Sequence, residues 1–115
     1  MTTLSGEKVL LRIFLGESDR FEKRPLWEEI LARLQRAGFS GATVLRGVSG
    51  FGPKSVKAKP RLFSLSPDLP IIIETVESED RVRAFLPELD RLVIDGLVTL
   101  ERAQVILHRS GESPA

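Results

Sequence analysis

Residues 9–15 read Val-Leu-Leu-Arg-Ile-Phe-Leu, and this short apolar run, closed by Gly16, decides the fold. Its length and composition are typical of a β-strand. A strand with one face in water alternates apolar and polar side chains. One set of side chains can share a single face: Val9, Leu11, Ile13 and Leu15. Leu10 and Phe14 must then point to the other face, so the pattern predicts a strand that is apolar on both sides.

Three further strands are expected along the chain, at residues 42–48, 69–76 and 98–107. Each segment is short and rich in β-branched or other apolar residues. With two helices, the strands give the order βαββαβ. This order predicts an α+β, ferredoxin-like fold, in which two helices cover one face of a four-stranded antiparallel sheet. We expect a single domain over residues 1–115, with a loose tail at 110–115.

The two helices are marked by their ends and by their apolar stripes. Pro25 suits the first turn of a helix that stops at Gly38, and the polar residues 17–24 before it are expected to form a loop. Ser78 suits the N-cap of the second helix, in which Pro87 should cause a kink. The first stripe contains Leu26, Trp27, Ile30, Leu31 and Leu34. The second contains Val82, Phe85, Leu86, Leu89 and Val93.

The predicted sheet is also apolar on the face that the helices leave open. Leu10 and Phe14 point there, and the segments 71–73 and 105–107 are apolar on both faces of their strands. An apolar second face needs a partner. The simplest partner is another copy of the chain related by symmetry, so we expect a homo-oligomer whose sheets pack inward. The alternative is a monomer with a few exposed aliphatic side chains.

The composition argues against several classes of function. The 115 residues include no cysteine, which removes disulfides, thiol nucleophiles and thiolate metal sites. His108 is the one histidine, so a zinc site or a Ser-His-Asp triad has no support, and we expect neither a metal nor a catalytic site. A net charge of +1 gives no long-range attraction for nucleic acid. No N-terminal run is long enough for a signal peptide or a membrane span, which predicts a cytoplasmic protein that is not embedded in a membrane.

The segment 50–63, GFGPKSVKAKPRLF, is the strongest candidate for binding. Pro53 separates Gly52 from the following lysine, which does not fit a P-loop, and position 55 lacks the third glycine of a dinucleotide fingerprint. A flexible basic loop remains, with four cations: Lys54, Lys57, Lys59 and Arg61. Such a loop can bind phosphate, nucleic acid or an acidic protein face, or can be a solvated connection.

Other polar residues have both a functional and a structural interpretation. Candidates for ligand contact are Glu17, Asp19, Arg46, Thr99, Glu101 and Arg109. Glu17 and Asp19 can accept hydrogen bonds from ribose or adenine, or can be charges at a helix start. Arg12 and Glu74 lie inside strands, and we expect them to pair because a buried charge needs compensation.

Several short segments have counterparts in one known family. They are Thr43-Val44, Gly50-Phe51-Gly52, Ile71–Val76, Ala103–Ile106 and Arg109–Glu112. On these segments the chain resembles the PII-type nitrogen-regulatory signalling proteins. It resembles their uncharacterised PII-like relatives more closely, through residues 16–19, 41–44 and 96–101. The resemblance covers nearly the whole chain, including the order of its elements.

The resemblance implies a homotrimer that binds an adenine nucleotide in the clefts between subunits. The loop 50–66 would be mobile and would control a target protein, for which a membrane transporter or channel is one option. The ligand residues would be Gly47, Gly50, Phe51, Gly52, Lys54, Glu17, Asp19, Arg46, Thr99, Arg102 and Arg109. The target would meet Lys57, Lys59 and Arg61. A regulatory protein of this kind is not expected to be an enzyme.

The sequence departs from the PII pattern in three ways. PII proteins hold the outer phosphates with a second loop rich in glycine and lysine, whereas residues 95–102 are shorter and have Arg102 as their only cation. We therefore expect AMP, ADP or a cyclic nucleotide rather than Mg-ATP, and no tightly bound cofactor. The chain has no tyrosine, which rules out uridylylation of a loop tyrosine. Pro53 and Lys54 do not reproduce the loop base associated with 2-oxoglutarate.

Two other functions remain open at this point. A small nucleotide hydrolase would have to use Glu17 or Asp19 with a metal ion, without a paired-carboxylate motif. An RNA-binding module would need several exposed aromatic rings on the sheet, and Phe14 alone does not supply them. Nucleotide turnover and a salt-dependent gel shift distinguish these hypotheses from a nucleotide-binding regulator.

Overall fold

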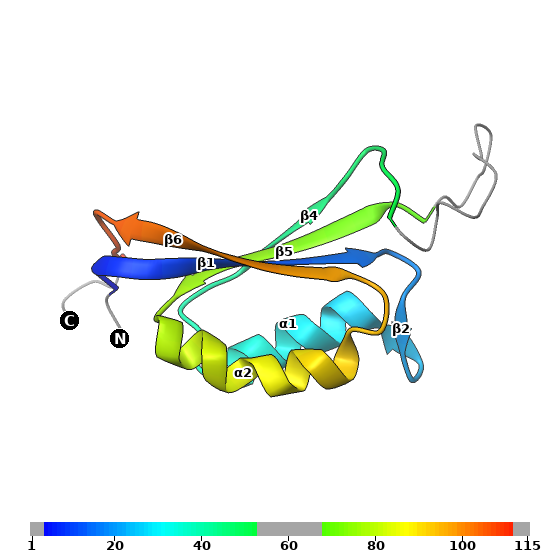
Figure 1. Cartoon of the computed structure of the whole chain (residues 1–115), viewed down its shortest axis with the longest axis horizontal. Helices are drawn as coiled ribbons and strands as arrows, with labels where there is room; N and C mark the ends of the chain where they lie inside the picture. Colours follow the sequence, from blue (N-terminus) through cyan, green and yellow to red (C-terminus); the bar gives the residue numbers. More distant parts are fainter. Residues whose placement is uncertain (1–3, 53–67, 112–115) are drawn as a thin grey trace.

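The structure is a computed structural model that describes residues 4–52 and 68–111. Its elements are β1 Gly6–Gly16, β2 Arg20–Phe21, β3 Arg24–Pro25, α1 Leu26–Arg36, β4 Thr43–Arg46, β5 Pro70–Glu77, α2 Glu79–Leu92 and β6 Leu97–Val105. The main sheet has the order β4-β5-β1-β6, and its neighbouring strands are antiparallel. Both helices lie against one face of this sheet (Figure 1). The predicted ferredoxin-like arrangement is therefore confirmed.

The two central strands alternate between the faces of the sheet. Four side chains of β1 are buried beneath the helices: Val9, Leu11, Ile13 and Leu15. The residues between them are only half-buried. In β5, Ile71 and Ile73 are buried, whereas Ile72 is half-buried on the other face. The sequence predicts that alternate side chains of the first strand point to opposite faces of the sheet. The structure shows this alternation in β1 and also in β5.

The helices close the core with one stripe each. α1 buries Leu26, Ile30 and Leu34, and α2 buries Val82, Phe85, Leu89 and Leu92. Burying a side chain of this size stabilises the fold by about 1.5–3 kcal/mol. Trp27 and Val93 of the predicted stripes pack only partly against this core. The Ser78 hydroxyl accepts a hydrogen bond from the Arg81 N–H at 3.3 Å, which confirms the predicted N-cap, and α2 continues through Pro87.

Several predicted boundaries differ from the structure. β6 ends at Val105 and not at residue 107, because its partner strand β1 begins at Gly6, which lies opposite Val105. Beyond that point Ile106 is 93% exposed. β4 spans Thr43–Arg46 only, which is shorter than the predicted strand at 42–48.

The segment 17–24, predicted as a loop, contains a small hairpin of β2 and β3. Glu22 at its tip has a φ of 55°. Phe21 packs partly against the core, and the guanidinium of Arg33 lies 5.2 Å from its ring centre. The hairpin thereby packs against α1.

Buried carboxylates connect the layers. Glu77, 2% exposed, accepts hydrogen bonds from the Ser40 N–H at 2.9 Å and from its hydroxyl at 3.1 Å, which holds the chain between α1 and β4. Glu29 is also buried and accepts a 2.7 Å hydrogen bond from Arg33 Nε, which lowers the pKa of Glu29 below its ordinary range. Within the described part of the chain, no helix is long and apolar enough to cross a membrane.

Candidate functional site

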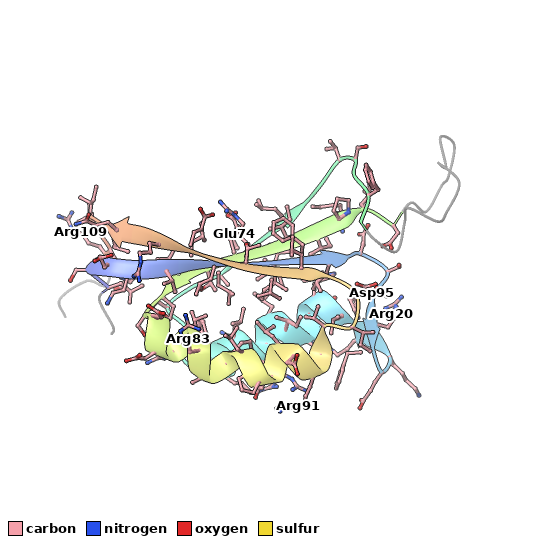
Figure 2. The ribbon with its side chains drawn as sticks, viewed as in Figure 1. Arg20, Glu74, Arg83, Arg91, Asp95 and Arg109 are labelled. Atoms are coloured by element: carbon pink, nitrogen blue, oxygen red, sulfur yellow. The ribbon has the colours of Figure 1, made fainter. Side chains whose placement is uncertain are left out.

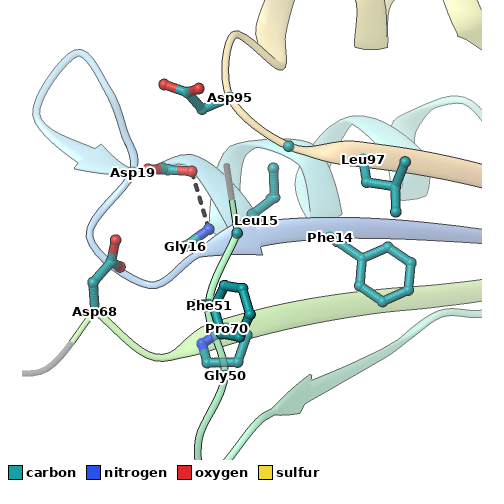
Figure 3. Close-up of a pocket in the computed structure, with 12 residues that line it drawn as sticks. Phe14, Leu15, Gly16, Asp19, Gly50, Phe51, Asp68, Pro70, Asp95 and Leu97 are labelled. Atoms are coloured by element: carbon teal, nitrogen blue, oxygen red, sulfur yellow. Dashed lines mark hydrogen bonds between the residues drawn. The ribbon is translucent and has the colours of Figure 1, made fainter. Parts of the chain in front are cut away.

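A cavity of about 260 Å³ opens at the end of the sheet where β1 finishes. Its lining residues are Phe14, Leu15, Gly16, Asp19, Gly50, Phe51, Gly52, Asp68, Pro70, Asp95, Gly96 and Leu97. They come from the end of β1, from the segment after β4, from the start of β5 and from the turn before β6 (Figure 3). The cavity therefore lies where four separate parts of the chain converge.

The turn after β1 is held by backbone hydrogen bonds and by the carboxylates of Asp19 and Asp68. The Gly16 N–H donates to Asp19 Oδ2 at 3.0 Å, and the Asp19 N–H donates to the Gly16 carbonyl at 3.1 Å. The Asp19 carbonyl in turn accepts from the Leu26 N–H at 2.8 Å, which ties the turn to the first residue of α1. Ser18 N–H donates to Asp68 Oδ1 at 2.9 Å. The turn after β1, which forms one wall of the cavity, is thus bonded to the start of α1 and to Asp68.

The two ends of the predicted loop are also joined to each other. The Gly47 N–H donates to the Pro70 carbonyl at 2.7 Å, and the Glu17 N–H donates to the Leu69 carbonyl at 2.8 Å. A Cβ atom at position 47 would lie 2.5 Å from Pro70 Cγ, so the close approach of these segments depends on glycine. An ion pair of 2.5 Å between Arg46 Nη2 and Glu17 Oε2 adds a side-chain link. Four predicted cations of this loop (Lys54, Lys57, Lys59 and Arg61) lie outside the described residues.

The cavity wall combines apolar surface with carboxylates. Phe14, Phe51, Pro70 and Leu97 supply the apolar part. The Phe51 side chain is 83% exposed, which leaves its ring available to a ligand. Asp19, Asp68 and Asp95 supply acceptor oxygens, and the described lining residues include no cation. Such a wall suits a flat apolar group that carries hydrogen-bond donors.

The structure places the predicted ligand residues in three groups. Gly50, Phe51, Gly52 and Asp19 line the cavity. Glu17, Arg46 and Gly47 lie beside it: Glu17 is bonded to Leu69, Gly47 is bonded to Pro70, and Arg46 pairs with Glu17. Lys54 falls outside the described residues.

The third group lies away from the cavity. Thr99 sits opposite Arg12 on the edge strand β6. Arg102 lies 3.8 Å from Glu7 and 3.9 Å from Glu79. Arg109 follows β6 at the far end of the sheet (Figure 2). Within one chain, these three residues do not reach the cavity.

Several lining residues were missed from the sequence: Phe14, Leu15, Asp68, Pro70, Asp95, Gly96 and Leu97. Two glycines next to strand ends gave the available signal: Gly16 is the last residue of β1, and Gly96 directly precedes β6. Gly96 comes so close to β1 that a Cβ atom there would lie 2.6 Å from the Phe14 carbonyl oxygen. Only the strand register reveals that this turn faces the end of β1.

The open face of the sheet has a charged centre between apolar ends. Arg12 Nε donates to Glu74 Oε2 at 2.8 Å, which confirms the predicted pair, and Arg12 Nη1 also bonds Glu101. The hydrogen bond to Glu74 raises the pKa of Arg12 above its ordinary value. Leu10 and Val76 lie to one side of this group and line a second hollow of about 560 Å³. Within the described residues, no cluster of histidine, aspartate and glutamate could hold a metal ion.

Comparison with known proteins gives consistent matches over most of the chain. Residues 8–105 match the DUF190 family, described as uncharacterized ACR, COG1993. A UPF0166 protein of Aquifex aeolicus is 38% identical over 100 residues, which cover 87% of this chain and 94% of that protein. A UPF0166 protein of Methanocaldococcus jannaschii is 38% identical over 97 residues, covering 84% and 89% respectively.

Solved structures with the same fold include PII-like proteins. One, described as a PII-like signalling protein from Thermus thermophilus, has a TM-score of 0.59 at 20% identity and covers 88% of this chain and 91% of its own. Another is CPII, a nitrogen regulatory PII-like protein from Thiomonas intermedia, solved bound to ADP, AMP and bicarbonate. It has a TM-score of 0.58 at 21% identity and covers 91% of this chain and 99% of its own. At these identities the two structures establish the fold.

Proposed function

Because the chain belongs to the DUF190 family and has the fold of PII-like proteins, we propose that it is a regulatory protein that binds an adenine nucleotide. One observation carries the proposal: the cavity is built from both ends of the loop predicted to act on a partner. A ligand in this cavity would touch Gly50 and Phe51 on one side and Asp68 and Pro70 on the other. Binding and loop conformation would then be coupled, since each can favour one state of the other.

The chemistry of the wall supports an adenine ring. The ring would stack on Phe51 and against Leu97, and base–aromatic stacking is worth about 1–3 kcal/mol per base. The adenine amino group and the ribose hydroxyls would donate to the carboxylates of Asp19 and Asp95. The same fold binds ADP and AMP in CPII of Thiomonas intermedia. The cavity is smaller than typical whole-ligand pockets, so the phosphates would extend beyond it.

The distant cations support sites shared between copies. Arg102 and Arg109 lie away from the cavity of their own chain, whereas a neighbouring copy could bring them to it. The apolar open face needs such a neighbour, and we propose a trimer with the sheets inward. The loop cations would meet an acidic surface of a target protein in the cytoplasm, and no catalytic step is assigned to the site.

Isothermal titration with adenosine, AMP, ADP, Mg-ATP and GMP tests this proposal. AMP or ADP should bind more tightly than Mg-ATP, and GMP should bind weakly. Phe51→Ala should weaken AMP binding about 5- to 100-fold, as expected for a lost stacking partner. Val48→Ala is the matched control, because Val48 is 95% exposed in the same segment and does not line the cavity.

Two outcomes would count against the proposal. Equal binding of AMP and GMP would remove the adenine site. Release of product from ATP or ADP during incubation with Mg²⁺ would favour the nucleotide-hydrolase alternative.

A further inference from the structure

We propose that Glu17 limits the affinity of the site for ligands that carry a phosphate, because its carboxylate occupies Arg46 until a ligand phosphate displaces it. The inference rests on the proposed function, since it concerns the same cavity. It goes further by assigning a specificity-determining role to one residue beside the cavity wall. Glu17 directly follows the lining residue Gly16, and Arg46 directly precedes Gly47, which is bonded to the lining residue Pro70.

The ion pair is close but exposed. Arg46 Nη2 and Glu17 Oε2 are 2.5 Å apart, while the two side chains are 56% and 32% exposed. An exposed pair of this kind contributes little net free energy, because water competes for both charges. A ligand phosphate can therefore replace the Glu17 carboxylate at small cost. The guanidinium of Arg46 can bind a phosphate through two parallel hydrogen bonds.

The surrounding charge disfavours ligands with many phosphates. Asp19, Asp68 and Asp95 line the cavity, and Glu17 adds a fourth carboxylate beside it. Arg46 is a cation beside the cavity, and Glu17 already neutralises it. A first phosphate gains Arg46 but must displace Glu17. Each further phosphate meets the same carboxylates and needs a cation from elsewhere, such as Arg102 or Arg109 of a neighbouring copy.

The exchange leaves the ends of the loop joined. The hydrogen bonds from Glu17 to Leu69 and from Gly47 to Pro70 use backbone atoms, so they persist when the side chains part. Glu17→Gln should therefore change the charge at the site without loosening its frame. This makes the substitution a clean test of electrostatic selection.

The experiment compares adenosine, AMP, ADP and ATP on the wild-type protein and on Glu17→Gln. The variant should bind AMP, ADP and ATP roughly two- to fivefold more tightly, with adenosine unchanged. The gain should shrink at high ionic strength, where exposed charges are screened. Arg46→Gln should abolish the preference for AMP over adenosine. Asp80→Asn is the control, because it removes one negative charge from the exposed first turn of α2 and should leave all four affinities unchanged.

An unchanged ratio of ADP to adenosine affinity in Glu17→Gln would overturn the inference while leaving the proposed function intact. If the wild-type protein binds none of these adenine compounds, the proposed function fails. Inorganic pyrophosphate then still tests the ion pair by nuclear magnetic resonance. The Gly47 amide signal should shift at lower pyrophosphate concentration in Glu17→Gln than in the wild type, and identical titrations would overturn the inference.

Discussion

Both faces of the main sheet carry apolar side chains, but the faces differ in what covers them. On the face under the helices, Ile13 and Ile73 are fully buried. On the open face, Ile72 is half-buried and Leu97 is 57% exposed. Two short helices can cover only one side of a four-stranded sheet, so the apolar residues of the other side stay uncovered within one chain. We therefore assign the buried residues under the helices to the stability of the single chain. We assign the apolar residues of the open face to assembly.

The open face also has a feature that the covered face lacks. Arg12, Glu74 and Glu101 form a group of ion pairs at its centre, whereas the polar residues that β5 places on the covered face, Thr75 and Glu77, are buried. Charges at the centre of an interface contribute more to its register than to its affinity. In a symmetric assembly, this group would fix how the copies are rotated relative to one another.

Two neighbouring isoleucines on β5 test the comparison most strongly. Ile73→Ala should lower the free energy of unfolding by about 2–5 kcal/mol, because it opens a hole in a fully packed core. Ile72→Ala removes the same atoms from the open face and should cost the single chain much less. Urea unfolding at several protein concentrations measures both effects. The Ile72 variant should depend more steeply on concentration, since its defect lies in association. Equal losses in the two variants would contradict the assignment of the faces.

Glu77→Ala should affect the covered side alone. It leaves the Ser40 N–H and the Ser78 N–H without their buried acceptor, at a cost of about 1.5–3 kcal/mol. Thermal unfolding measures the loss, and the mass of the native assembly should not change. Glu88→Ala is the control, a glutamate on α2 outside the buried set. An assembly that dissociates in the Glu77 variant would show that the two sides of the sheet are not independent.

The smallest expected effect concerns acid stability. The hydrogen bond from Arg33 lowers the pKa of Glu29 from its ordinary value of 4.5, so the unfolded chain binds the proton more readily. The stabilisation by Glu29 is complete at neutral pH and is lost as the pH falls through the folded-state pKa. Glu29→Gln should therefore show a flatter loss of stability below pH 4.5 than the wild type. Parallel acid-unfolding curves would contradict this role.

Much of the fold could be predicted because strand periodicity is a local signal. The alternation of Val9, Leu11 and Ile13 gave the buried face directly. Strand ends were harder, because they depend on a partner: Ile106 continues the apolar run, but β1 has no residue in register with it. The hairpin at Arg20–Pro25 was missed, since its one apolar anchor, Phe21, stands among charged residues.

The site was predictable only in part, for a related reason. Gly50–Gly52 and Asp19 stood out by residue type, and the structure brings them to one cavity. Asp68 and Asp95 gave no local signal, because their place depends on how the ends of β5 and β6 meet the end of β1. Arg109 stood out by its charge and Arg102 through the comparison with the PII phosphate loop, and within one chain both lie apart from the cavity.

Native mass spectrometry of the protein as purified, beside Val76→Asp, tests the central claim most directly. The wild type should appear at three times the chain mass of 12.8 kDa, with about one adenylate retained per chain. Val76→Asp places a charge on the open face and should appear at the mass of one chain without ligand. A wild-type protein that remains a single chain at micromolar concentration would contradict the account, because the open face would then be stable in water.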